Sequence, residues 1–238
     1  QPMKAGLACS SLTLSHPSEG VGTLSFSLPP GSAMVVIGRN GSGKSTLLKT
    51  LAGILPVRSG TVTLDSASMA SMRPRERAHR LAFVSATPPR GTSLTVSDVM
   101  ELALEAGGHP VQADRVNQAM EEGGVQQWAQ MPLDTLSDGM AQRVMLARAA
   151  AQSDALVLLD EPTAFLDVVG RREVMADVAR WRQAGKTVIM ATHDLDAVHE
   201  SGWADRWLLM RPPSQGGALV PDEPFTSSAA KALLLGQD

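Results

Sequence analysis

The chain has little cysteine, few aromatic residues and no long apolar run. Its 238 residues include one cysteine, Cys9, and no tyrosine, and the aromatic content is only 3%. A lone cysteine excludes an intramolecular disulfide, so we expect a reducing compartment. The longest apolar runs, such as residues 155–159, stop far short of the roughly 18 residues that span a bilayer. Residues 1–30 also lack the pattern of a secretory signal. The sequence therefore predicts a cytoplasmic chain that does not cross a membrane by itself.

Neither sign of charge dominates. The chain carries 21 Lys and Arg against 24 Asp and Glu, for a formal net charge of −3. This balance argues against a general nucleic-acid binder, which needs a basic surface. With 43% apolar residues, the chain is long enough to bury a good core. We expect one domain over residues 1–238.

From Ala33 onward, short aliphatic or β-branched runs alternate with helical patterns. This alternation is typical of a parallel sheet with crossover helices, so the predicted fold class is α/β. The strands of this sheet are expected at residues 33–37, 61–64, 81–85, 155–160, 187–191 and 206–210. Between the third and fourth of these, only helical patterns occur, at residues 96–106, 113–122 and 141–152. They predict an all-helical insertion at about 87–150, and one last short helix is expected to end near Leu235.

Residues 38–45 read Gly-Arg-Asn-Gly-Ser-Gly-Lys-Ser and fit the P-loop pattern G-x-x-x-x-G-K-[ST]. An expected strand enters the segment and an expected helix, 44–52, leaves it, as a P-loop requires. The backbone N–H groups of such a loop face a polyphosphate at the helix N-terminus. Lys44 supplies charge to the β- and γ-phosphates, Ser45 offers a hydroxyl to Mg²⁺, and Thr46 adds a phosphate contact. The residues assigned to nucleotide binding here are Gly38, Arg39, Asn40, Gly41, Ser42, Gly43, Lys44, Ser45 and Thr46.

A second part of the site is expected where the apolar run Ala-Leu-Val-Leu-Leu ends in Asp160 and Glu161. The two-residue period of a strand predicts that these carboxylates point to opposite sides. We assign Asp160 to the metal and Glu161 to general-base or water-orienting work. His193 follows the expected strand 187–191, where an imidazole can reach a γ-phosphate and orient Glu161 and water. The predicted catalytic residues are thus Lys44, Glu161 and His193.

With Leu136-Ser-Asp-Gly-Met-Ala-Gln-Arg143 added, the order of motifs resembles the nucleotide-binding subunit of an ATP-binding cassette (ABC) transporter. The phosphate loop, helical insertion and signature segment are followed by Leu-Leu-Asp-Glu-Pro-Thr, Phe165-Leu166-Asp167 and His193. The resemblance implies a P-loop NTPase core with a mostly parallel sheet and a small antiparallel β region on its N-terminal side. It also implies ATP hydrolysis with Mg²⁺ by a head-to-tail homodimer. In that dimer, Ser137 and the Gly139 backbone contact the γ-phosphate held by the other subunit.

The sequence departs from the family pattern in three places. Asp138 and Met140 stand where the signature has Gly and Gln; Asp138 either caps its own helix or weakens nucleotide binding in trans, because it adds a carboxylate beside phosphate. Ala86 stands where the family has a Gln, so the metal coordination or the link to the membrane partner must differ. His16 stands in place of the base-stacking aromatic. An imidazole stacks on adenine with less area, and an ordinary loop histidine is an equal alternative.

The resemblance implies an ATPase subunit that works with an integral membrane permease, peripherally at the cytoplasmic face of the inner (cell) membrane. The segments Leu-Ser-Asp-Gly, Asp-Glu-Pro-Thr-Ala-Phe-Leu-Asp and Thr-His-Asp-Leu-Asp look most like ATPases of iron–siderophore, haem or cobalamin importers. An importer also implies a separate substrate-binding protein. Two alternatives are a regulatory cassette that binds ATP with weak turnover and an ABC-type ATPase acting on nucleic acid. The second is disfavoured because no coiled-coil insertion or second cassette is present, and we expect no nucleic-acid partner.

Overall fold

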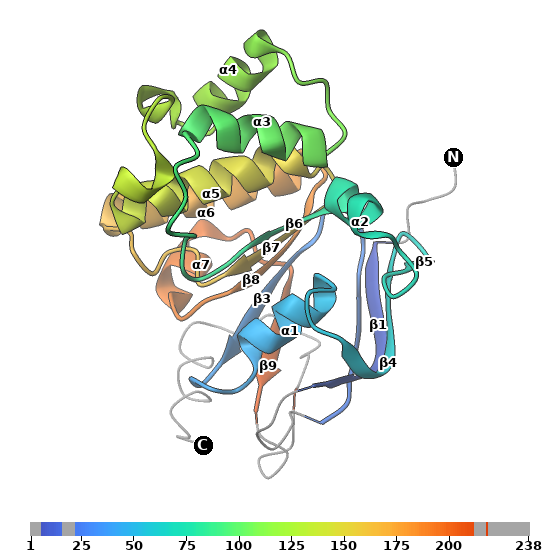
Figure 1. Ribbon diagram of the computed structural model, residues 1–238. Helices are drawn as coiled ribbons and strands as arrows, with labels where there is room; N and C mark the ends of the chain where they lie inside the picture. The colour runs from blue at the N-terminus through green and yellow to red at the C-terminus, as the bar shows by residue number, and fades with distance from the viewer. Residues whose placement is uncertain (1–5, 16–21, 212–217, 219–238) are drawn as a thin grey trace.

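The computed structural model describes residues 6–15, 22–211 and 218, and its centre is a parallel sheet of five strands. Their order is β6-β7-β8-β3-β9. A four-stranded antiparallel sheet, β2-β1-β4-β5, lies beside it (Figure 1). The parallel strands are β3 (Ala33–Gly38), β6 (Leu81–Val84), β7 (Leu156–Asp160), β8 (Thr187–Ala191) and β9 (Arg206–Met210). The antiparallel strands are β1 (Leu7–Leu14), β2 (Leu24–Leu28), β4 (Val57–Leu64) and β5 (Ala67–Ser68).

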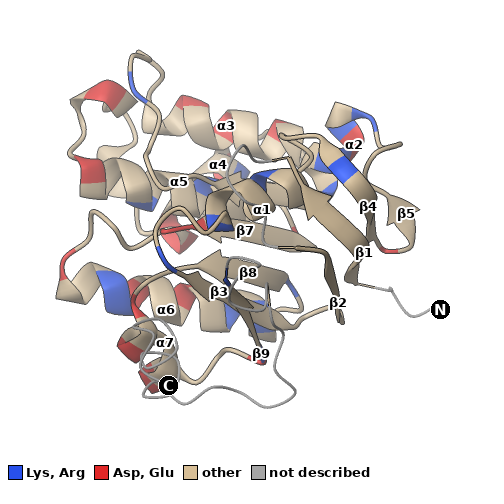
Figure 2. Cartoon of the chain, turned by 90° about the horizontal axis from the view of Figure 1, so that it is seen from below, with Lys and Arg blue, Asp and Glu red and all other residues tan. Residues whose placement is uncertain are grey.

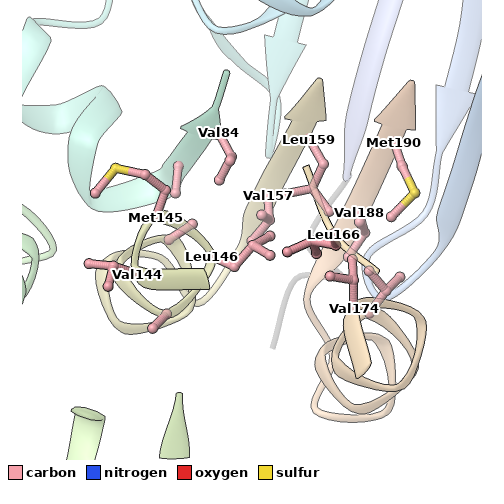
Figure 3. Close-up of a cluster of buried hydrophobic side chains, with 14 of the residues drawn as sticks. Val84, Val144, Met145, Leu146, Val157, Leu159, Leu166, Val174, Val188 and Met190 are labelled. Carbon is pink, nitrogen blue, oxygen red and sulfur yellow. The ribbon is translucent and has the colours of Figure 1, made fainter. Parts of the chain in front are cut away.

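The parallel sheet is buried on both faces because its strands are apolar at successive positions. In β7, Val157 and Leu159 pack into one core, and Leu156 and Leu158 into another. Helices α5 (Asp138–Gln152) and α6 (Val168–Gln183) cover the first face, where Figure 3 shows Leu146 and Val174 beneath the strands. Helix α1 fills the space between the other face and the antiparallel sheet. The helices outside the insertion are α1 (Lys44–Leu51), α2 (Pro74–Arg80), α6 (Val168–Gln183) and α7 (Leu195–Ser201).

The described chain between β6 and β7 consists of helices joined by loops and contains no strand, only one isolated bridge between Thr95 and Pro132. Its helices are α3 (Val96–Ala106), α4 (Ala113–Glu122), α5 (Asp138–Gln152) and the short 3₁₀ turns Gln126–Trp128 and Leu133–Thr135. The predicted bounds of α3 and α4 are confirmed. Helix α5 begins earlier than predicted because Ser137 caps it, with Ser137 Oγ accepting from the Met140 N–H at 3.2 Å.

One predicted strand was placed in the wrong sheet. Residues 61–64 belong to β4, which pairs antiparallel with β1 and β5 rather than joining the parallel sheet. The first half of β4 is largely exposed, whereas Val62 and Leu64 are buried. One-sided burial of this kind suits an antiparallel sheet, while a central parallel strand is apolar on both faces. Two predictions, the role of His16 and the last helix near Leu235, lie outside the described residues.

Charged side chains of both signs are interspersed on the outer helices, while the strands carry few (Figure 2). The basic helix α2 buries none of its residues. Within the described ranges, no helix is both long enough and apolar enough to span a bilayer.

The single cysteine provides a test of the core between the two sheets. Cys9 on β1 is only 3% exposed, and burial raises the pKa of its thiol to about 11. Because only the thiolate reacts, about one thiol in a thousand is reactive at pH 8. We expect iodoacetamide to label the native protein far more slowly than the guanidinium-unfolded protein, as measured by intact mass. Equal labelling rates would show that this core is open.

Candidate functional site

The phosphate loop joins the end of β3 to the start of α1, and two glycines fix its path. Gly43 caps α1 with φ of 95°, in the left-handed region that glycine adopts without strain. A Cβ on Gly38 would lie 2.5 Å from Ser42 Oγ and 2.7 Å from the Met210 carbonyl oxygen. Side chains at these two positions would therefore displace the loop.

An open depression of about 490 Å³ lies over this loop. It is lined by Asn40, Gly41, Ser42, Gly43, Lys44, Ser45, Thr46, Glu161, Ala164 and His193. Gly38 and Arg39 contribute in another way, because their carbonyl oxygens accept from Lys44 Nζ at 2.9 and 3.4 Å. Lys44 is buried, and burial lowers its pKa, although the nearby carboxylates of Glu161 and Asp160 oppose that effect.

Asp160 and Glu161 stand at the shared edge where the parallel neighbours β7 and β8 end. Asp160 is 2% exposed and accepts a hydrogen bond from Ser45 Oγ at 2.9 Å. The prediction that the two carboxylates point to opposite sides was wrong, because the strand ends at Asp160. Glu161 has φ of 46°, and its N–H donates to the Ala191 carbonyl at 2.9 Å. The side chain of Glu161 therefore turns toward Lys44 in the first turn of α1. Asp160 contacts the next residue of the same turn, Ser45.

The three predicted catalytic side chains meet in one triangle. His193 Nε2 lies 3.2 Å from Lys44 Nζ and 3.0 Å from Glu161 Oε1, and the last atom is 3.9 Å from Lys44 Nζ. Glu161 Oε2 accepts from the His193 backbone N–H at 3.3 Å. Burial raises the pKa of Glu161, although the positive charge of Lys44 acts in the opposite direction. The pKa of His193 is lowered, mainly by burial and secondly by the charge of Lys44. A neutral imidazole is therefore favoured beside the carboxylate.

Two buried polar atoms at the depression show which ligand the site fits. Ser42 Oγ and Glu161 Oε1 have no hydrogen-bond partner among the described residues, although His193 Nε2 lies 3.0 Å from Glu161 Oε1. A hydroxyl that can donate to phosphate and a carboxylate oxygen that can accept from water suit a triphosphate and its attacking water. No group of three or more His, Cys, Asp or Glu side chains that could hold a metal ion occurs in the described part of the chain. The hydroxyl of Ser45 and the carboxylate of Asp160 are oxygen groups of the kind that Mg²⁺ prefers, and this ion ordinarily keeps phosphate and water ligands as well.

The signature residues lie elsewhere. Ser137 is exposed, and neither Ser137 nor Gly139 lines the described surface of the phosphate depression. Ala86 and its neighbour Ser85 do not line it either, and the Ser85 hydroxyl donates to the Thr87 carbonyl at 2.5 Å. No side chain of this segment therefore replaces the family's glutamine at the depression.

The structure also reveals a polar residue that sequence reasoning missed. Gln142 of α5 is completely buried, and its Nε2 donates to the Ser85 carbonyl at 3.4 Å. It ties α5 to the segment after β6. A glutamine among the apolar positions of a predicted helix was the available signal.

Taken with the fold, this arrangement defines a P-loop nucleotide hydrolase. The sequence pattern of the family described as "ABC transporter" matches residues 21–164. The chain belongs to the ABC transporter family and is an ATP-binding subunit that hydrolyses ATP.

Two relatives place the chain more closely. It is 38% identical over 198 residues to an achromobactin transport ATP-binding protein of Dickeya dadantii, covering 78% of this chain and 72% of that protein. It is 36% identical over 180 residues to an iron(3+)-hydroxamate import ATP-binding protein of Bacillus subtilis, covering 73% of this chain and 67% of that protein.

Solved structures show the same fold. An ATP-binding subunit of an ABC transporter superposes with a TM-score of 0.76 at 22% identity, covering 87% of this chain and 86% of that one. The cbiO1 protein of Clostridium perfringens, part of the ABC transporter complex cbiONQ, gives 0.71 at 27% identity over 88% and 86% of the two chains. The predicted α/β class, with a parallel sheet and a smaller antiparallel sheet, is confirmed.

Proposed function

We propose that the chain forms a head-to-tail homodimer that closes on ATP and drives an integral membrane permease importing an iron–siderophore, haem or a related chelate. The observation that carries the ATPase role is the triangle of Lys44, Glu161 and His193 beside the phosphate loop. The cargo is supported by relatives named for achromobactin transport and iron(3+)-hydroxamate import. Such a system also uses a substrate-binding protein. The chain then acts peripherally at the cytoplasmic face of the membrane, as one ATPase domain over 1–238 with an insertion at about 87–150.

In the proposed mechanism, the loop backbone from Gly38 to Thr46 cradles the phosphates. Lys44 exchanges its bonds to the Gly38 carbonyl and His193 for bonds to phosphate oxygens. An ammonium group only donates, so His193 Nε2 accepts while Lys44 is bonded to it. Once Lys44 turns to phosphate, that nitrogen is released, and in the tautomer that carries the proton on Nε2 it donates to Glu161 or to a γ-phosphate oxygen. Glu161 Oε1, buried and without a hydrogen bond, then orients the attacking water and takes its proton.

We assign Ser45 and Asp160 to the side of the site that holds Mg²⁺, since Ser45 Oγ already donates to Asp160 at 2.9 Å. When bound, Mg²⁺ would offset the charge that develops on the phosphates during hydrolysis. Ser45 Oγ would be a ligand of the ion, and Asp160, which accepts from that hydroxyl, would position Ser45 and the water ligands of the ion. Ala86, in place of a glutamine, offers the ion no side-chain ligand.

The homodimer places Ser137 and the Gly139 backbone against the nucleotide of the other subunit. Ser137 is exposed at the N-terminus of α5, where N–H groups favour an anion. Apolar side chains lie exposed after the neighbouring turn, with Phe165, Val168 and Val169 at 41%, 65% and 63% exposure. Exposed apolar side chains beside the N-terminus of α5 are typical of a surface that a partner covers.

A mixing experiment tests this arrangement. A Ser137→Arg chain and a Lys44→Ala chain should each be inactive as homodimers, because both composite sites are damaged. Their heterodimer retains one intact composite site, so a 1:1 mixture should recover about a quarter of wild-type ATPase activity.

The matched control mixes the Ser137→Arg chain with a Ser137→Arg/Lys44→Ala chain. This mixture offers no intact Ser137 and should recover nothing. If proven heterodimers of the two single variants are as inactive as the control, Ser137 acts within its own subunit and the head-to-tail dimer is wrong.

A further inference from the structure

One arginine contacts the chain on both sides of Ser137, the residue that we propose to bind the nucleotide of the opposite subunit. Arg90, in the segment between β6 and α3, donates from Nη1 to the Leu136 carbonyl at 2.8 Å, and its Nη2 contacts Asp138 Oδ1. Leu136 precedes Ser137 and Asp138 follows it. A single planar guanidinium therefore binds the residues on both sides of Ser137. Arg90 Nη1 also donates a longer hydrogen bond, of 3.4 Å, to the Leu133 carbonyl.

The contact settles which role Asp138 plays. Ser137 Oγ, rather than Asp138, accepts from the Met140 N–H and caps α5, while the Asp138 carboxylate is paired with Arg90. Without a partner, that carboxylate would stand next to Ser137 at a helix terminus that has to meet phosphate. Charges of one sign at such distances repel well inside the roughly 10 Å Debye length of 0.1 M salt.

We propose that Arg90 is a positioning residue for the signature segment, which neutralises Asp138 and fixes the backbone of Ser137 so that Ser137 can meet the γ-phosphate of the opposite subunit. The inference rests on the head-to-tail dimer proposed above. Arg90 belongs to the segment in which Ala86 stands in place of glutamine. This segment thus contacts the signature through a guanidinium and does not reach the phosphate depression in its own subunit.

The expected consequence is confined to dimer closure. Arg90→Ala leaves the P-loop intact, so ATP binding to a single subunit should be unchanged. Dimer formation with ATP should need about fivefold more nucleotide, which corresponds to about 1 kcal/mol of repulsion for each of the two ATP molecules that the dimer binds. Adding Asp138→Asn to Arg90→Ala removes the unpaired carboxylate and should restore most of the loss.

The experiment uses the full-length chain with Glu161→Gln, in which the ATP-bound dimer accumulates, and measures dimer fraction against ATP concentration by analytical ultracentrifugation. The series is Arg90→Ala, Arg90→Lys, Asp138→Asn and Arg90→Ala/Asp138→Asn, with Arg115→Ala as control because Arg115 is an exposed arginine on α4. Arg90→Lys keeps the charge and should fall between the parent and Arg90→Ala. The loss in Arg90→Ala should shrink as salt rises from 0.05 to about 0.5 M, since screening removes repulsion and not misfolding.

Each outcome decides between the two proposals. Arg90→Ala dimerising as readily as the parent overturns the role of Arg90 alone, and Arg90→Ala/Asp138→Asn remaining as weak as Arg90→Ala overturns the neutralisation of Asp138. A parent chain that stays monomeric in ATP overturns the head-to-tail dimer and this inference with it.

Discussion

Glu161→Gln should reduce ATP hydrolysis by about two orders of magnitude or more while leaving ATP binding intact. The amide keeps the size of the carboxylate but cannot take a proton from water. Because burial already favours the uncharged form of Glu161, the neutral amide should fit the site without strain. The ATP-bound dimer should accumulate, and this can be measured as phosphate release alongside the oligomeric state.

Glu76→Gln is the matched control, since Glu76 lies on the exposed helix α2 and forms an ion pair with Arg80 of the same helix. It should hydrolyse ATP at the wild-type rate. Turnover of Glu161→Gln close to wild type would remove Glu161 from the chemistry and leave His193 as the residue to examine next.

Lys44→Ala should instead weaken ATP binding itself, by about tenfold to a hundredfold, the range expected for losing a hydrogen bond to a charged group. The lost charge faces oxygens that are present before any transition state, so the dissociation constant rises before the rate of chemistry is considered. The substitution also frees the Gly38 carbonyl and His193, both of which Lys44 contacts in the structure.

Fluorescent ATP titration measures the effect, with Lys49→Ala as control. Lys49 lies in the last turn of α1, away from the lining of the depression in the described structure, and its removal should leave affinity unchanged. Equal affinities for Lys44→Ala and the wild type would contradict the assignment of Lys44 to the phosphates.

The features that the sequence predicted well are local. The loop from Gly38 to Ser45 is one contiguous pattern between a strand and a helix, and α3 and α4 carry helical periodicity bounded by glycines. The two predictions that were wrong depend on structure that the neighbouring residues do not determine. The direction of Glu161 depends on a turn just past the end of β7, and the placement of residues 61–64 depends on pairing with the distant strand β1.

The contact between Arg90 and Asp138 could not be predicted from the sequence. The two residues are 48 positions apart, and neither has a distinctive neighbour that marks it as a partner. Only the packing of the helical insertion brings them together. Asp138 could therefore be recognised from the sequence as a departure but not interpreted.

At Glu161, the residue type that best suits the backbone conformation differs from the one that the proposed chemistry requires. Its φ of 46° is one that side-chain-bearing residues adopt at a cost of about 1 kcal/mol, and glycine adopts freely. A sequence selected for folding alone would therefore drift toward glycine at this position. If Glu161 takes the proton of the attacking water as proposed, selection for ATP turnover is what keeps glutamate there against this preference for glycine. In a lineage that no longer needed turnover, position 161 is where the loss should appear early.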